Sequence, residues 1–164
     1  MQVGIAGTFT EKINLGTVVA VKSEYLGDTG VEENGVFKDL FDLQLASQNE
    51  LPFANKSLDN IDLKKWNITA LPTVTSVTIN EITTRQERIT QLLEKYDPEI
   101  ESMEGASLHY CCIKTGVPFI QIRAISNHVG ERDKSKWAFG EAFKNLSQTV
   151  VEYIEQLNLV KETL

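Results

Sequence analysis

The chain has 164 residues, of which 41% are hydrophobic and 24% are charged, and its formal net charge is −7. This length and composition fit one globular domain over residues 1–164 and exclude a disordered segment. The acidic balance argues against general binding of nucleic acid, because phosphate contacts need a basic surface. No apolar run approaches the roughly 20 residues that cross a bilayer, and no basic leader precedes a long apolar stretch. We therefore expect a cytoplasmic protein that binds neither membrane nor nucleic acid.

The only cysteines, Cys111 and Cys112, are adjacent and lie in a segment with a helical pattern. A disulfide between neighbouring residues is rare, and two adjacent thiols do not make a metal site. We expect two buried or half-buried thiols in a reducing compartment, and the sequence predicts no metal and no cofactor.

The first half of the chain predicts three strands, with a long irregular segment before the third. Residues 3–7 indicate a strand that runs into a glycine turn, and residues 17–25 alternate apolar and polar side chains as a second strand. Residues 26–70 contain scattered Asp, Asn and Gly with weak periodicity, which indicates loops with short elements. A β-branched run over residues 72–80 predicts the third strand.

The next segment alternates helices and strands. A helix over residues 85–96 begins after a Thr83 or Thr84 cap, and a second helix over residues 104–115 ends at Gly116. Residues 100–103 form a short strand or extended entry between them. Residues 117–126 are apolar enough for a central strand.

A long amphipathic helix from about residue 135 to residue 157 ends the chain. Its predicted buried side consists of Trp137, Ala142, Phe143, Leu146, Val150, Tyr153, Ile154 and Leu157. The regular alternation after residue 72 predicts an α/β fold with helices packed on a largely parallel sheet.

Small or polar residues stand at the ends of four predicted strands, at residues 4–7, 78–80, 102–104 and 126–127. Ligands of open α/β sheets bind at the carboxyl ends of strands, so these four segments predict a small-molecule site. Glu104 at that edge has two readings. It is an acidic residue in a first helical turn, favoured by the helix dipole, or a carboxylate that accepts hydrogen bonds from two neighbouring hydroxyls.

The two histidines are weaker candidates. His109 on the second predicted helix has no partner in sequence, and the packing reading outweighs that of a catalytic base. His128 lies beside the predicted site, but no serine or cysteine nucleophile accompanies it.

Three segments carry a resemblance to a known family: Ser102-Met103-Glu104-Gly105-Ala106, Val117-Pro118-Phe119, and Ile122-Arg123-Ala124-Ile125-Ser126-Asn127. In order and spacing they resemble the nucleoside phosphorylase and nucleosidase superfamily, as do Gly4-Ile5-Ala6-Gly7 and Leu15-Gly16-Thr17-Val18-Val19. The string from Ser126 to Trp137 looks like the futalosine hydrolase branch, whose members release hypoxanthine from futalosine in an alternative route to menaquinone. The resemblance spans nearly the whole chain. It implies a three-layer α/β/α sandwich with a mixed central sheet that lacks the family's N-terminal strands.

The resemblance also implies roles for single residues. Glu104 takes the place of the glutamate that binds the ribose 2′ and 3′ hydroxyls, and Met103 that of the methionine packed against the sugar. Ser102 stands where adenosine-cleaving relatives carry a second glutamate. Four further residues take substrate-binding positions, two by close backbone approach and two against the base: Ala6, Gly7, Thr78 and Ile79. The family often has an aromatic residue at the position of Thr78, so base stacking is not expected from this residue.

Asn127 departs from the pattern of the adenine-specific relatives, which carry an aspartate there that acts at N7 of the leaving base. An amide cannot easily supply a proton, but it offers both a donor and an acceptor. It accepts from a protonated N7 while donating to a 6-oxo group, so we predict Asn127 as the catalytic residue for a 6-oxopurine. We further hypothesise that Arg132 or a nearby lysine meets a remote substrate carboxylate.

These residues predict a nucleosidase that hydrolyses the N-glycosidic bond of a futalosine-type 6-oxopurine nucleoside and releases hypoxanthine. The resemblance implies a homodimer or higher homo-oligomer. Two alternatives remain: a 6-oxopurine nucleoside phosphorylase, and a truncated paralogue that binds purines without catalysis. The resemblance also implies further strands before the Gly4 strand, which in hydrolases supply the acid that activates water. We therefore expect that acid upstream of Met1.

Overall fold

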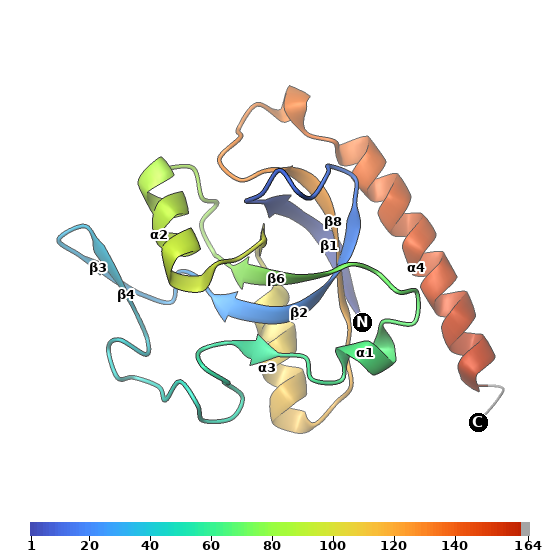
Figure 1. Ribbon diagram of the computed structural model, residues 1–164, viewed down its shortest axis with the longest axis horizontal. Coiled ribbons are helices and arrows are strands. Elements are labelled where there is room, and N and C mark those ends of the chain that lie inside the picture. The colour runs from blue at the N-terminus through green and yellow to red at the C-terminus, as the bar shows by residue number, and fades with distance from the viewer. Residues whose placement is uncertain (162–164) are drawn as a thin grey trace.

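The protein is described by a computed structural model that covers residues 1–161 (Figure 1). Six strands form one sheet in the order β5-β2-β6-β7-β1-β8. Their bounds are β1 (Gln2–Thr8), β2 (Val18–Leu26), β5 (Leu58–Asp59), β6 (Thr73–Thr78), β7 (Ile100–Ser102) and β8 (Gln121–His128).

The sheet is mixed and closes on itself. β8 pairs in parallel with β1 and antiparallel with β2, so the run β2-β6-β7-β1-β8 returns to its first strand. β2–β6 and β6–β7 are parallel, whereas β1–β7 and β2–β5 are antiparallel. The expected mixed sheet is confirmed. The alternation of helices and strands did not reveal the antiparallel pairs.

Four α-helices surround this sheet (Figure 1): α1 (Leu63–Trp66), α2 (Gln86–Tyr96), α3 (Gly105–Thr115) and α4 (Phe139–Lys161). A 3-10 turn spans Lys134–Lys136. Gly116 ends α3 in the left-handed conformation at φ 65°, as predicted. The predicted threonine cap of α2 is wrong: Arg85 takes the cap position, and the backbone N–H of Thr83 donates to Glu101 instead. Both cysteines are free thiols on α3, and Cys111 is exposed rather than buried.

α4 lies along β8, β1 and β2 and buries Ala142, Leu146 and Tyr153 against them. Two residues of its predicted buried side, Phe143 and Ile154, are 54% and 45% exposed. The predicted apolar face of the helix is wider than its contact with the sheet. Residues at the edges of that face, such as Phe143 and Ile154, therefore lie outside the core. Within the described part of the chain, no helix combines the length and apolar character needed to cross a bilayer.

The segment between β2 and β6 is more ordered than its sequence suggested. β3 (Gly30–Glu33) and β4 (Val36–Asp39) form an antiparallel hairpin that stands away from the main sheet (Figure 1). Asn34 and Gly35 make its two-residue turn with φ of 54° and 77°. Positive φ at both positions is the geometry that favours Asn-Gly, because it matches the twist of the flanking strands.

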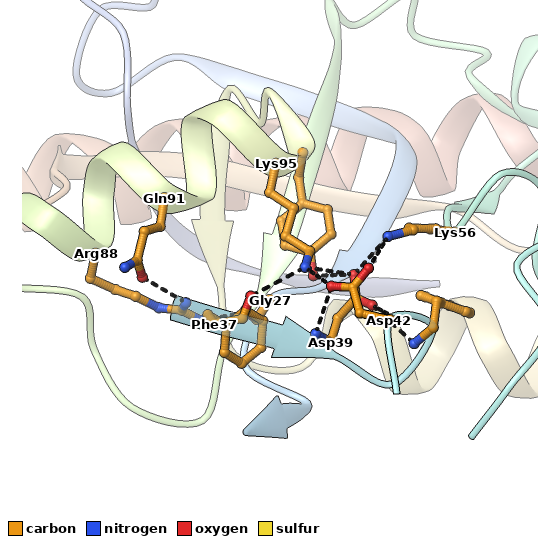
Figure 2. Close-up of polar contacts among 10 residues, drawn as sticks. Gly27, Phe37, Asp39, Asp42, Lys56, Arg88, Gln91 and Lys95 are labelled. Carbon is orange, nitrogen blue, oxygen red and sulfur yellow. Dashed lines mark hydrogen bonds and ion pairs between the residues drawn. The ribbon is translucent and has the colours of Figure 1, made fainter. Parts of the chain in front are cut away.

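A buried carboxylate fastens the end of this hairpin to α2 (Figure 2). The side chain of Asp39 is fully buried and accepts from Lys56 at 3.1 Å, Lys95 at 3.2 Å and the Tyr96 hydroxyl at 3.2 Å. Asp42 lies beside it and pairs with the same two lysines. Burial pushes the pKa of Asp39 up, but the hydrogen bonds from the Asp42 backbone and the lysines outweigh burial and lower it.

A second contact joins the same elements (Figure 2). The guanidinium of Arg88 on α2 lies 4.1 Å from the ring centre of Phe37 and donates to the Gly27 carbonyl. The hairpin and the end of β2 are therefore fixed to one helix.

We predict that Asp39→Ala lowers the free energy of unfolding by about 3 kcal/mol, because it leaves two lysines and a buried tyrosine hydroxyl without their common acceptor. Urea denaturation followed by circular dichroism measures this change. Glu33→Gln is the control, since it removes an exposed ion pair with Lys38 on the same hairpin and should cost less than about 1 kcal/mol. Equal losses in the two variants would contradict the assigned role.

Candidate functional site

The four segments predicted to form a site meet around a cavity of about 290 Å³ at the ends of β1, β7 and β8. The segment after β6 closes one side of the cavity. Seven predicted site residues line it: Ala6, Gly7, Ile79, Ser102, Met103, Glu104 and Asn127. Three further polar or aromatic residues line the cavity, and sequence reasoning assigned none of them an individual role in the site: Glu101, Ser126 and Trp137.

Two predicted residues, Thr78 and Arg132, do not line this cavity. The Thr78 hydroxyl is buried under α3, where it donates to Glu24 and accepts from the Ala106 N–H. Arg132 is exposed, and its guanidinium lies 5.9 Å from the ring centre of Trp137. Trp137, which lines the cavity, thus lies next to Arg132, and Thr78 binds the backbone at the start of α3.

Glu104 presents its carboxylate to the cavity while Arg123 holds one oxygen. Oε2 of Glu104 lies 2.9 Å from Nη1 of Arg123, and the side chains are 59% and 2% exposed, respectively. Arg123 also donates to Oε1 of Gln2 and to the Ile5 carbonyl. A buried arginine that donates to three acceptors, Glu104 among them, keeps this carboxylate oriented. The signal for this role was present in the sequence as a charged residue inside an apolar strand.

The Asn127 amide is oriented by its chain neighbours. Its Oδ1 accepts from the Ser126 hydroxyl at 2.8 Å, and its Nδ2 donates to the His128 carbonyl at 2.9 Å. One N–H and one lone pair remain for a ligand. A Cβ on Gly7 would lie 3.2 Å from Nδ2, so the glycine lets β1 pass beneath the amide without crowding it.

The side chains of the two histidines make none of the contacts that orient Asn127 or Glu104. His109 is buried, shares a 2.8 Å hydrogen bond through Nδ1 with the Leu58 carbonyl and packs edge-on against Phe119. Burial lowers the pKa of His109 to about 4, so the ring is neutral, and the packing reading is confirmed. His128 lies 3.7 Å from the exposed carboxylate of Glu11.

Among the described residues that line the cavity, Glu101 and Glu104 are the only carboxylic acids. Within residues 1–161, no three His, Cys, Asp or Glu side chains come together as metal ligands. The chemistry that the cavity offers is therefore hydrogen bonding by two carboxylates, one amide and two serine hydroxyls.

A buried glutamate supports the start of α3, immediately after Met103 and Glu104. Glu24 on β2 accepts from the Ser76 hydroxyl at 3.0 Å and from the Thr78 hydroxyl at 2.8 Å. The Thr78 hydroxyl in turn accepts from the Ala106 N–H at 2.8 Å. These contacts, Glu24 to Thr78 and Thr78 to Ala106, thus fix the first turn of α3. They also fix the backbone of Glu104, the residue that precedes the helix.

Gly105 leaves no space for a side chain at this point. A Cβ there would overlap Oε2 of Glu24 and approach Nε2 of Gln121 to 2.5 Å, and both of these neighbours are buried. We predict that Gly105→Ala lowers the free energy of unfolding by about 2 kcal/mol through overpacking. Chemical denaturation measures this loss.

Gly140→Ala on α4 is the matched control for Gly105→Ala. Its Cβ would meet nothing within 4 Å, and alanine is the better helix former, so we expect no loss or a gain of up to about 1 kcal/mol. Similar stability of the two variants would show that the contact at Gly105 is not as tight as described.

Glu24 should also give the protein a pH-dependent stability. Burial raises the pKa of Glu24 to about 7, against the opposing hydrogen bonds from Thr78 and Ser76. The folded state then binds the proton more tightly than the unfolded state, so the resulting stabilisation is complete below about pH 4.5 and is lost as the pH rises to about 7. We predict that Glu24→Gln removes this pH dependence, worth on the order of 3 kcal/mol. Parallel denaturation series of the two proteins between pH 4.5 and 8 would contradict it.

The chain is similar to known proteins over most of its length. The family model described as the phosphorylase superfamily matches residues 1–161. A futalosine hydrolase of Streptomyces coelicolor is 29% identical over 148 residues, which are 90% of this chain and 61% of that protein. A futalosine hydrolase of Thermus thermophilus is 28% identical over 148 residues and is covered to 65%. The chain thus spans less than two thirds of the length of these curated relatives.

Solved structures share the fold. A 5′-methylthioadenosine/S-adenosylhomocysteine nucleosidase of Colwellia psychrerythraea, solved with adenine, superposes with a TM-score of 0.70 at 22% identity. The match covers 94% of this chain and 65% of that one. The futalosine hydrolase of Helicobacter pylori superposes with a TM-score of 0.70 at 14% identity, with 93% and 66% of the two chains covered.

Proposed function

The chain belongs to the phosphorylase superfamily, and from that premise we propose that it is a purine nucleosidase acting at the cavity described above. The observation that carries the proposal is the assembly of Met103, Glu104 and Asn127 around one small cavity. The similarity to two futalosine hydrolases supports the same reaction class, hydrolysis of an N-glycosidic bond.

In this proposal Glu104 holds the sugar. Two vicinal ribose hydroxyls donate to its carboxylate, and the bond to Arg123 on Oε2 keeps that carboxylate in place when the cavity is empty. Met103 is 44% exposed at the cavity edge and supplies an apolar surface for the ribose. The sugar is thereby oriented relative to the base.

The base leaves with the electron pair of the bond between C1′ and N9. Negative charge grows on the purine as this bond breaks, and hydrogen bonds from fixed donors strengthen with that charge. The free N–H of the Asn127 amide is such a donor, and Ser126 and His128 fix its direction. Water then attacks C1′ of the cation-like sugar, and the proton that the water loses passes to the purine anion, which leaves as the neutral base.

We propose a futalosine-type 6-oxopurine nucleoside as the substrate and hypoxanthine as the product. An amide at position 127 suits a base that presents both an acceptor and a donor along its N7 and O6 edge. Arg132 above Trp137 remains our candidate for a remote substrate carboxylate. The cytoplasmic location and the homo-oligomeric state remain predictions of the sequence.

Release of hypoxanthine from futalosine and from inosine, measured with and without phosphate, tests this function. We expect release without phosphate, and a loss of about tenfold or more in kcat/KM for Glu104→Gln, because a charged acceptor for two hydroxyls is replaced by a neutral one. Glu99→Gln is the control: it lies outside the cavity, and its amide oxygen can still accept from the Thr75 N–H. Release that requires phosphate would identify a phosphorylase, and no release from either nucleoside would overturn the proposal.

A further inference from the structure

Glu101 is a cavity residue to which the reaction outlined above gives no role. It lies on β7, is 8% exposed, and lines the cavity with Met103 and Asn127. Its Oε1 accepts one long hydrogen bond of 3.4 Å from the Thr83 N–H. Its Oε2 is buried without a hydrogen-bond partner among the described residues. Burying a carboxylate oxygen without a hydrogen-bond donor costs free energy. Because this oxygen belongs to a cavity residue, a bound ligand can supply the missing donor.

The strand register sets Glu101 opposite Asn127. Gly7 of β1 pairs with Glu101 on one side and with Asn127 on the other, and directly paired residues point to the same face of a sheet. Neighbouring strands lie about 4.8 Å apart, so the two outer backbones are separated by about 10 Å. Gly7 has no side chain, and the carboxylate of Glu101 and the amide of Asn127 line the same cavity with it.

We propose that Glu101 is a specificity-determining residue that accepts a hydrogen bond from the N1–H of a 6-oxopurine base. This proposal rests on the proposed function and assigns the second polar contact of the base that Asn127 holds at N7 and O6. Hypoxanthine carries a hydrogen on N1, which satisfies Oε2. Adenine carries a lone pair on N1, which would face the carboxylate and leave it without a donor.

The surroundings of Glu101 act on its pKa in opposite directions. Burial raises the pKa of Glu101, the hydrogen bonds from Thr83 and the positive charge of Arg88 oppose this effect, and the negative charge of Asp28 adds to it. Arg88 is itself held by Phe37 and the Gly27 carbonyl (Figure 2). An N–H from the base would stabilise the ionised form that burial disfavours, at Oε2, which accepts no hydrogen bond from the described residues.

Calorimetric titration of the 164-residue chain with hypoxanthine, 1-methylhypoxanthine and adenine tests the proposal. We expect the unmodified chain to bind hypoxanthine about tenfold or more tightly than either of the other two bases. Glu101→Gln can turn its amide N–H toward N1 of adenine, so the preference over adenine should narrow several-fold. Glu101→Ala removes the acceptor and makes room for a methyl group, so the preference over 1-methylhypoxanthine should disappear.

Glu99→Gln is the matched control, because it makes the same chemical change two residues earlier and outside the cavity, and it should keep both preferences. Circular dichroism at the titration temperature confirms that each variant is folded. Equal binding of hypoxanthine and 1-methylhypoxanthine by the unmodified chain, or an unchanged preference in Glu101→Ala, overturns the role of Glu101.

Hypoxanthine release, assayed in parallel, separates this inference from the proposed function. Preferences that depend on Glu101 without release of hypoxanthine support the inference and overturn the nucleosidase alone. Release without any dependence on Glu101 overturns the inference alone, and failure to bind hypoxanthine overturns both.

Discussion

β8 is hydrogen-bonded on both sides, in parallel to β1 and antiparallel to β2, and the remaining structure depends on this double pairing. It closes the sheet, so the outer edges of two strands are paired and their backbone groups are satisfied. It also carries Arg123 into the interior and places Asn127 beside Gly7 of β1. The Asn127 amide and the arginine that holds Glu104 are therefore two positions of one strand, four residues apart.

The site depends on a small number of buried polar contacts that leave little freedom. The Thr78 hydroxyl links Glu24 to the Ala106 N–H, and position 105 has room only for glycine against the Glu24 carboxylate. The pair Arg123–Glu104 places one charge in the interior and the other at the cavity surface. Burying these polar groups costs desolvation free energy, but the contacts fix the direction of the Glu104 carboxylate. A carboxylate that is already fixed loses little entropy on binding a ligand.

The hairpin β3–β4 is a separate unit attached to α2 by a polar clamp and not by a core. Asp39, Lys56 and Lys95 supply that clamp, with Phe37 under Arg88 beside it. Because Arg88 also bonds the Gly27 carbonyl, the clamp reaches the end of β2 and, through the charge of Arg88, the environment of Glu101. The segment with the weakest periodicity in the sequence is thus coupled to the wall of the cavity.

Much of the molecule was determined by local sequence. The β-branched run of β6, the apolar run of β8, the Gly116 stop of α3 and the polar residues at the strand ends all led to the correct elements, and seven predicted residues do share one cavity. The Asn34-Gly35 turn carried an equally local signal that weak periodicity on either side concealed. Three features depend on the tertiary structure alone. β7 pairs with β1 in antiparallel fashion, and the Thr78 hydroxyl donates to Glu24 instead of lining the cavity. Glu101 is buried in the strand position that faces Asn127 across Gly7. A sequence states which side chains alternate along a strand, but which strands become neighbours depends on long-range pairing, and the partner of a buried polar group is set by that pairing alone.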